Sequence, residues 1–385
     1  MKMFIRIPSS LEILKRIGAI GGKRGIRIYL VGGPVRDIIL GKTSIDLDLV
    51  SETPAQQVAS ILADELKGKV TFFPEFLTAR IEWEEGTIDV ATARREYYPV
   101  PAALPEVIPA TMREDLKRRD FTINAMALSL HPDNFGELFD PFGGYKDLKE
   151  GVIRFLHPKS FVDDPTRILR GLRFSARFGF RFEETTERHI KKDKDGLLLI
   201  SGERRRKEVR LLLREGLPAI RLLEKYELLP LLGFSSLHCI NPPEDAQKLF
   251  SLSDPWFFYF ILLTWEKEIS LLERLYCLRK EEREEIIKTR KIVELEDEKE
   301  IVLSMRGLSP AALATLYAKG VTLSLDFFKK IDTLKVETSG GEIVQKGFQG
   351  REIGRILEEL FYLRFKGIVR TKEDEERWIE RLKKG

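Results

Sequence analysis

The sequence has very few of the residues that hold transition metals or build disulfide frameworks. Its 385 residues include two cysteines, Cys239 and Cys277, and four histidines. Two cysteines are too few for the disulfide framework of a small secreted domain or for a cysteine zinc site. The histidines are not spaced as ligand pairs, and none of them precedes an aspartate, so a phosphohydrolase activity has no support. The sequence therefore predicts no transition-metal chemistry.

Long apolar runs are also missing. The longest run, from Trp256 to Trp265, is much shorter than the roughly 20 residues that a membrane-spanning helix needs. The first residues lack the pattern of a signal peptide. We therefore expect a cytoplasmic globular protein with no membrane partner, and its length predicts about two to four domains.

The net charge is small, only +4 at pH 7, but it is unevenly distributed. Residues 146–215 contain 19 lysines and arginines against 12 aspartates and glutamates, so this stretch carries +7 and the remainder is negative. A local basic excess is typical of a surface that binds a polyanion. Solvated helices give a similar excess, so the charge alone does not identify a partner.

The stretch 29–50 has the pattern of a strand, a glycine turn, a short helix and a second strand. The first strand, from Ile26 to Val31, ends at Gly32-Gly33, where the missing side chains permit positive φ and let a ligand approach the backbone. A helix from Val35 to Leu40 follows. Its first amides and the side chain of Arg36 predict a site for an anionic triphosphate.

The second strand of this stretch alternates apolar and acidic side chains. Ile45, Leu47 and Leu49 point to one face, so Asp46 and Asp48 share the other. Two carboxylates this close repel each other unless a cation lies between them, and hard oxygen ligands suit Mg²⁺ that carries substrate phosphates. A solvated strand edge explains such a tripeptide in isolation. Its position after the glycine turn favours a metal site.

These residues together resemble the signature of the class II tRNA nucleotidyltransferase and bacterial poly(A) polymerase family. The first match is Leu30-Val31-Gly32-Gly33-x-Val35-Arg36-Asp37 followed by Asp46-x-Asp48. The second is Glu114-Asp115-Leu116-x-Arg118-Arg119-Asp120-Phe121-Thr122-Ile123-Asn124-Ala125-Met126-Ala127. The resemblance covers most of the chain and implies an α+β fold. A polymerase-β-like nucleotidyltransferase head with a mixed sheet is expected, followed by an all-helical neck, body and tail.

The resemblance gives the family's third acidic position to Asp89, on a strand expected from Thr87 to Ala91 after a hairpin turn at Glu84-Glu85-Gly86. In nucleotidyl transfer two metals ease the attack by an oxygen and the departure of pyrophosphate, and a third carboxylate can bind one of them. The implied catalytic residues are therefore Asp46, Asp48 and Asp89, with Mg²⁺ on Asp46 and Asp48. An exposed strand aspartate without a function is the alternative for Asp89.

The family's base-reading pair matches Asp164 and Arg167, near the start of a helix with one apolar stripe. Cytosine and adenine both present an amino donor beside a ring-nitrogen acceptor, so a carboxylate can accept from the first and a guanidinium can donate to the second. Uracil and guanine present a carbonyl group instead of the amino group. The protein would then select the nucleotide without a nucleic-acid template.

The other members of the nucleotide-binding set follow from the same motifs. Arg119 suits a triphosphate, and Asp120 with Asn124 supplies polar groups for a ribose hydroxyl or, alternatively, a helix cap and a buried polar contact. Further nucleotide contacts come from two arginines on the helix after Arg167. The full set is Gly32, Gly33, Arg36, Arg119, Asp120, Asn124, Asp164, Arg167, Arg170 and Arg173.

The resemblance divides the chain into four parts. They are a catalytic head (1–150), a neck that recognises the base (151–215), a helical body (216–305) and a helical tail expected to contact tRNA (306–385). Within the head, Thr53 is expected to cap a helix that begins at Pro54. Four prolines in residues 95–112 predict a long loop that forms neither a continuous helix nor a central strand.

The implied function is addition of CCA, or of only the terminal A, to tRNA from CTP and ATP, with release of pyrophosphate. The expected partners are the 3′ end and the acceptor and T-arm side of tRNA. A bacterial poly(A) polymerase is the nearest alternative, although its usual Gly-Lys-Arg-Phe-type signature is replaced by Phe73-Pro74-Glu75-Phe76-Leu77. A non-catalytic RNA-binding protein is a second alternative, but it has no reason to retain three aspartates together.

Overall fold

The computed structural model describes residues 2–42, 46–236, 254–331 and 334–384. The chain divides into two compact units, Met1–Arg204 and Arg205–Gly385. The boundary between them lies inside the predicted neck, and the predicted division into four parts stays a prediction.

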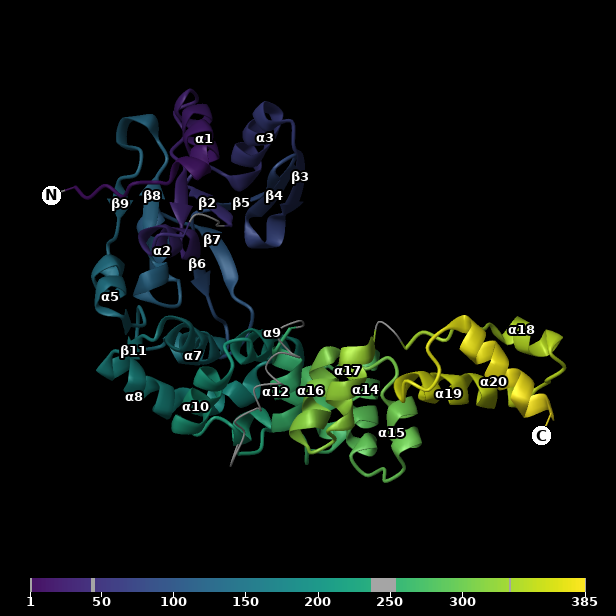
Figure 1. The fold of residues 1–385 in the computed structure, drawn as a ribbon. Coiled ribbons are helices and arrows are strands. Elements are labelled where there is room, and N and C mark those ends of the chain that lie inside the picture. The colour runs from purple at the N-terminus through teal and green to yellow at the C-terminus, as the bar shows by residue number, and fades with distance from the viewer. Residues whose placement is uncertain (1, 43–45, 237–253, 332–333, 385) are drawn as a thin grey trace. The chain divides into compact units, whose positions relative to one another are not determined.

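A seven-stranded mixed sheet forms the centre of the first unit, with the strand order β3-β4-β5-β2-β1-β8-β9 (Figure 1). Strands β2 and β5 pair in parallel, and the other neighbours are antiparallel. The strands are β1 (Tyr29–Val31), β2 (Leu47–Ser51), β3 (Lys69–Phe73), β4 (Thr78–Trp83), β5 (Gly86–Thr92), β8 (Ala127–Ser129) and β9 (Leu138–Phe139). The mixed sheet and the helices after it confirm the predicted fold class.

Helix α3 (Ala55–Leu66) packs on strands β3 to β5, and α1 (Glu12–Gly22) lies beside it on the same side of the sheet. The predicted cap of α3 by Thr53 is wrong, because no side chain next to the helix accepts from its first amides. The amide of Ala55 donates instead to Thr92 Oγ1 at 2.8 Å. A residue on β5 therefore satisfies the start of the helix.

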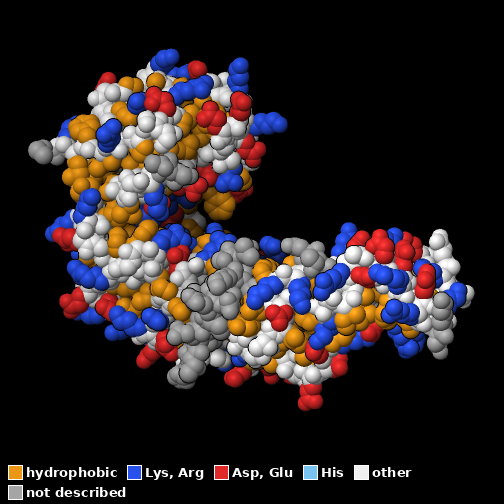
Figure 2. All heavy atoms as spheres, in the orientation of Figure 1, with side chains coloured by type: hydrophobic (Ala, Val, Ile, Leu, Met, Phe, Trp, Pro, Cys, Tyr) orange, Lys and Arg blue, Asp and Glu red, His pale blue; other side chains and the backbone are white. Residues whose placement is uncertain are grey.

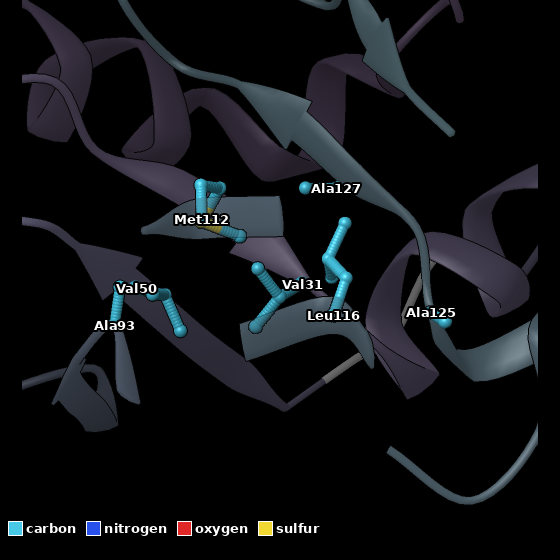
Figure 3. Packing of buried hydrophobic residues seen from close by; sticks show 7 residues of the cluster. All are labelled: Val31, Val50, Ala93, Met112, Leu116, Ala125 and Ala127. Carbon is cyan, nitrogen blue, oxygen red and sulfur yellow. The ribbon is translucent and has the colours of Figure 1, made fainter. Parts of the chain in front are cut away.

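The opposite face of the sheet carries a core cluster that includes α4 (Met112–Lys117). Figure 3 shows Met112 and Leu116 of this helix beside Val31 and Val50 of neighbouring strands. A capping box formed by Thr111 with Glu114 begins the helix. Because Val50 follows Asp48 by two residues, α4 packs on the face of the sheet to which Asp48 points.

The proline-rich segment contains regular structure, so the prediction of a loop over 95–112 was only partly right. Strand β6 (Arg94–Tyr97) pairs with β7 (Glu106–Pro109) in an antiparallel ribbon outside the main sheet. Pro99, Pro101 and Pro105 lie in the connection between the two strands. Proline is excluded from a central strand but is tolerated at the edge of such a ribbon, where Pro109 pairs with Arg94.

The first unit continues with short elements that surround the ribbon and the sheet. Helix α7 (Thr166–Phe178) buries its apolar stripe, formed by Ile168, Leu169 and Leu172, but Arg167 and Arg173 are buried as well. The polar side of this helix is therefore not a solvated surface. The remaining α-helices and strands of this unit are α2 (Gly33–Ile39), α5 (Gly144–Glu150), β10 (Val152–Ile153), α6 (Ser160–Asp163), β11 (Arg181–Phe182) and α8 (Glu184–Asp193). Helix α9 (Gly202–Leu213) begins in this unit and continues into the second.

The second unit is helical over its described residues. Every side chain of α12 is buried, so the most apolar run of the chain forms a core helix. No helix in the described ranges is long and apolar enough to cross a membrane. The sequence also predicts a helix from Ala246 to Leu252, which lies outside the described residues. The helices are α10 (Leu217–Lys225), α12 (Trp256–Leu263), α13 (Ile269–Tyr276), α14 (Lys280–Ile292), α15 (Glu298–Ser304), α16 (Pro310–Ala318), α17 (Leu323–Lys330), α18 (Gly340–Gln345), α19 (Arg351–Phe365) and α20 (Lys372–Lys384).

Candidate active site

The sheet register brings two of the three predicted catalytic aspartates side by side. Asp48 on β2 is the direct partner of Asp89 on β5, and Asp46 lies just before β2. Burial raises the pKa of Asp48 above its ordinary value, the charge of Asp89 raises it further, and Arg119 opposes the shift. The carboxylates therefore form an electrostatic cluster that a cation would stabilise.

Arg80 is a further member of this cluster that the sequence analysis did not predict. It pairs with Asp89 across β4 and β5, and its guanidinium donates two hydrogen bonds of 2.7 and 2.9 Å to that carboxylate. The hairpin register was accessible from the sequence, because a turn at Glu84-Glu85 places Arg80 opposite Asp89. The pair is nearly half exposed, so it can exchange partners when a ligand binds.

A pocket of about 340 Å³ opens beside these residues. Its lining includes the carboxylates of Asp48 and Asp89 and the arginines Arg118 and Arg119. Phe73, on the edge strand β3, also lines it. The pocket combines carboxylates that can hold a metal with guanidinium groups that can bind phosphate.

A buried carboxylate on α4 fixes the two arginines of this pocket. Asp115 has no exposed side-chain surface and lies 2.9 Å from Arg118 and 3.1 Å from Arg119. Burial alone would raise the pKa of Asp115, but the charges of Arg119 and Arg118 outweigh it and hold the pKa below its ordinary value. The packing of α4 on the sheet thus determines where both guanidinium groups lie.

Position 32 requires glycine, because the backbone there has a positive φ and the side chain of Arg119 lies directly against it. The φ of Gly32 is +73°, and a Cβ at this position would lie 2.4 Å from Arg119 Nη1. Gly33 starts α2 and does not show this constraint. The glycine turn therefore leaves room for the side chain of Arg119, and the approach of a ligand to this backbone stays a prediction.

Arg36, predicted to bind a triphosphate, is buried in a polar network instead of lining the pocket of Asp48. Its Nη1 donates to Asn124 Oδ1 at 2.5 Å, and its guanidinium lies over the rings of Phe174 and Phe178 at 5.2 and 5.0 Å. These contacts join α2 to α7. A direct role in phosphate binding stays a prediction for Arg36.

Asp120, Asn124 and Arg170 continue the same network. Asn124 Nδ2 donates to Asp120 Oδ1 at 3.0 Å, and Arg170 donates to Asp120 Oδ2 through Nε and Nη2 at 2.9 and 2.5 Å. Burial opposes the charge of Asp120, but Arg170 and Asn124 lower its pKa to about 2. Arg173 is buried on the same helix, with its guanidinium 5.2 Å from the ring centroid of Phe174. Binding of a ribose or a phosphate by these groups remains untested.

The predicted base-reading pair lies together at the start of α7. Arg167 Nε is 4.0 Å from Asp164, and Arg167 is only 5% exposed. Its other nitrogens donate to Ser160 Oγ at 2.9 Å and to the carbonyl of Arg118 at 2.8 Å. Both contacts hold the guanidinium in one orientation.

Two more residues around this pair were missed. Arg204, at the start of α9, donates to Asp164 Oδ1 at 2.7 Å. Tyr98, after the ribbon strand β6, donates to Glu96 at 2.8 Å and is 3.4 Å from Arg167 Nη2. Contacts between segments so distant in the chain leave no local sequence pattern.

A second pocket of about 530 Å³ lies between the ribbon and the helix start. Tyr98, Arg167 and His157 line it, and Arg118 lines both this pocket and the one beside Asp48. Arg118 is therefore next to both pockets. One pocket contains Asp48 and Asp89 of the acidic cluster, and the other contains Arg167, for which base reading stays a prediction.

The donor set of the acidic cluster fits Mg²⁺. In the part of the chain that the structure describes, no three carboxylate, histidine or cysteine groups converge closely enough to hold a metal unaided. Mg²⁺ usually takes only one or two carboxylates and completes its coordination with water and substrate phosphates. Asp48 and its acidic neighbours meet that requirement.

Comparison with known proteins agrees with this geometry. The model of the Poly A polymerase head domain matches residues 28–154, and the model described as the probable RNA and SrmB-binding site of polymerase A matches residues 179–232. An A-adding tRNA nucleotidyltransferase of Aquifex aeolicus is 37% identical over 367 residues, which cover 87% of this chain and 44% of that protein. The chain spans less than half the length of the first curated relatives it matches.

Two solved structures match over nearly their whole length. The Thermotoga maritima CCA-adding enzyme complexed with tRNA is 31% identical, with a TM-score of 0.73 over 98% of this chain and 97% of that one. A CCA-adding enzyme in complex with CTP is 31% identical, with a TM-score of 0.76 over 99% of each chain. The shared motifs, the sheet that carries them and these full-length matches show that the chain belongs to the class II tRNA nucleotidyltransferase family of CCA- and A-adding enzymes.

Proposed function

We propose that this chain transfers a nucleotidyl group from a nucleoside triphosphate to the 3′ end of tRNA, and that ATP is its principal substrate. The observation that carries the proposal is the pairing of Asp48 with Asp89 in a pocket that also exposes Arg118 and Arg119. This arrangement unites metal ligands with phosphate-binding groups. The choice of ATP rests on the first three curated relatives, which are A-adding tRNA nucleotidyltransferases.

In the proposed reaction the terminal ribose hydroxyl of the RNA attacks the α-phosphate. A bond forms between that oxygen and the α-phosphorus while the hydroxyl proton is lost to water, the bond to the bridging oxygen of the β-phosphate breaks, and pyrophosphate leaves. Mg²⁺ held by Asp46 and Asp48 would neutralise the negative charge that develops on the transferred phosphate and would ease the attack by the hydroxyl oxygen. Arg119, fixed by Asp115 and passing Gly32, is positioned to bind the triphosphate. Asp89 would complete the acidic cluster on the side of the attacking hydroxyl.

Selection of the base is assigned to Asp164 and Arg167. Adenine offers an amino donor to the carboxylate and a ring acceptor to the guanidinium. Arg204 and Thr166 both donate to Asp164, which keeps this carboxylate beside Arg167. The restricted motion of both groups supports discrimination against bases that present a carbonyl group at the amino position.

The RNA partner proposed is tRNA, bound in part by the basic stretch 146–215 and by the helical second unit. The family model that matches residues 179–232 describes a probable RNA-binding site, and the Thermotoga maritima relative was solved in complex with tRNA. Figure 2 shows lysine, arginine, aspartate and glutamate side chains interspersed over the visible surface, so the basic excess does not form one uniform patch there. The cytoplasmic location stays a prediction.

Single-nucleotide incorporation tests this function directly. The protein would be incubated with Mg²⁺ and tRNAs lacking the last one, two or three nucleotides of CCA, with each triphosphate offered alone. We expect AMP to be added to the tRNA that lacks only the terminal A. Addition of CMP to the shorter tRNAs would extend the activity to full CCA synthesis. Absence of incorporation from any triphosphate would contradict the proposal and favour the non-catalytic RNA-binding alternative.

A poly(A) polymerase remains the competing enzymatic function. It would add many AMP units to an unstructured RNA of unrelated sequence. The same assay with such an RNA separates the two functions, because the proposed enzyme stops after one AMP on tRNA. Efficient addition of many AMP units to the unrelated RNA would show that the substrate is RNA 3′ ends in general and not tRNA.

A further inference from the structure

We propose that Phe73 is a stacking platform for the 3′-terminal base of the attacking RNA. The inference rests on the proposed function and adds a positioning residue to it. Phe73 is the last residue of β3, the edge strand of the sheet, and lines the pocket that contains Asp48 and Asp89.

The strand register puts Phe73 on the same face of the sheet as the acidic cluster. Asp48 pairs with Asp89, Asp89 with Arg80, and Arg80 with Thr71. Directly paired residues share a face, and so do residues two apart on one strand. Phe73 follows Thr71 by two residues, so its ring projects on the side of the carboxylates.

Phe72, one residue earlier on β3, lies on the opposite face of the sheet from Phe73. The alternation of β3 points it to the other face, where its partner Ala79 is buried. The exposed fractions are similar, 38% for Phe72 and 40% for Phe73. Only Phe73 of this pair lines the pocket. The two adjacent phenylalanines therefore differ mainly in the face they occupy.

The order of the strands shows which substrate Phe73 would meet. Gly32 directly follows β1 and lies against the side chain of Arg119, so both are on the β1 side of the acidic cluster, whereas β3 lies on its other side. The attacking and leaving oxygens are roughly in line during phosphoryl transfer. If the triphosphate occupies the side of Arg119, the RNA hydroxyl approaches from the side of β4 and β3.

The spacing suits a single nucleotide. Neighbouring strands are about 4.8 Å apart, so β3 lies roughly 10 Å across the sheet from the strand of Asp89. Arg80 lies on the strand between them and supplies a positive charge for an RNA phosphate. A terminal sugar near Asp89 would leave its base over Phe73. An aromatic ring binds any base through its π face, which suits positioning without reading sequence.

A binding assay without chemistry tests the platform. A tRNA acceptor minihelix would carry a fluorescent cytosine analogue, pyrrolo-cytosine, as its 3′-terminal base, and would be titrated with protein in EDTA without nucleotide. Stacking on Phe73 should quench the analogue when the wild-type protein binds. Phe73→Ala should remove this quenching, Phe73→Tyr should retain it, and Phe72→Ala should behave as wild type. Circular dichroism would confirm that all variants fold.

Steady-state kinetics provide the second readout. Phe73→Ala should raise the KM for tRNA roughly 5- to 100-fold, the range expected for one lost base stack, and leave the KM for ATP unchanged. Equal quenching by wild type and Phe73→Ala, or no quenching by either, would overturn the platform. Wild-type AMP incorporation is measured in parallel, so a failure of the proposed function is recognised separately. Quenching that depends on Phe73 in a protein without transferase activity would support the platform as an RNA contact alone.

Discussion

Arg80 holds Asp89 through two hydrogen bonds of 2.7 and 2.9 Å, so the third predicted catalytic carboxylate is already paired with a cation. The guanidinium thereby balances part of the negative charge that Asp89 shares with Asp48. Any metal that uses Asp89 must compete with Arg80. The pair is nearly half exposed, which keeps the energetic cost of this exchange small.

Removal of this competing cation should strengthen divalent-ion binding. We expect Arg80→Ala to lower the dissociation constant of Mn²⁺, used as a spectroscopic substitute for Mg²⁺, by up to about 5-fold, since exposed ion pairs contribute roughly 1 kcal/mol or less. Electron paramagnetic resonance of free Mn²⁺ measures the constant. Arg80→Lys is the matched control and should stay near wild type. Weaker Mn²⁺ binding in Arg80→Ala would show that the arginine organises the site instead of competing for it.

Loss of the central carboxylate should abolish catalysis but spare RNA binding. Asp48→Asn keeps the shape of the side chain and removes the charge that would hold Mg²⁺. Turnover should fall by at least ~10³-fold, or roughly 4 kcal/mol of barrier. The affinity for tRNA, measured by filter binding, should change little. Asp64→Asn, at an exposed position of α3, is the control. Near-normal turnover by Asp48→Asn would remove Asp48 from the metal site.

The ion pair between Asp120 and Arg170 should make stability depend on pH in a defined window. The folded pKa of Asp120 is lowered to about 2, so its stabilising effect is present above the unfolded pKa of about 4 and is lost as the pH falls toward 2. Asp120→Asn should lower the free energy of unfolding by about 2 kcal/mol at neutral pH, and the difference from wild type should shrink between pH 4 and 2. Urea titrations at several pH values measure it.

The exposed Asp64 again supplies the comparison for this experiment. Asp64→Asn should leave the free energy of unfolding nearly unchanged at each pH. A constant difference between Asp120→Asn and wild type from pH 7 to pH 2 would mean that the charge of Asp120 is not what stabilises the fold.

The parts of the site encoded within short stretches were predictable from the sequence. The Gly32-Gly33 turn and the alternation around Asp46 and Asp48 determine local geometry, and the predicted hairpin turn at Glu84-Glu85 fixes the register of Asp89. Each depends on residues a few positions apart. The mixed sheet was implied by the family resemblance that these motifs carry, and the strand pairings confirm it.

Features that depend on contacts between distant segments were not predictable. Thr92, at the end of β5, accepts the hydrogen bond from the first amide of α3. Arg204, 40 residues after Asp164 in the chain, donates to the carboxylate of Asp164. Tyr98 meets Arg167 only because the ribbon folds onto the start of α7. The residues around the prolines were misread because a two-stranded ribbon outside the main sheet tolerates proline at its edge.

The last prediction concerns base selection by Arg167, whose guanidinium is fixed by Ser160 and by the carbonyl of Arg118. Arg167→Lys keeps a positive charge but loses the planar fork that can donate to the ring acceptor of adenine. The kcat/KM for ATP should fall by an amount that corresponds to about 1.5–3 kcal/mol of lost transition-state stabilisation. The kcat/KM for UTP and for GTP should fall less, because these bases do not form the matched pair with Asp164 and Arg167. The preference for ATP over UTP and GTP should therefore become smaller. Arg177→Lys, on the exposed side of α7, is the control, and thermal unfolding of both variants reports on the fold. Equal losses for all four nucleotides would mean that Arg167 holds the fold or the phosphates, and base selection would have to be assigned to other residues.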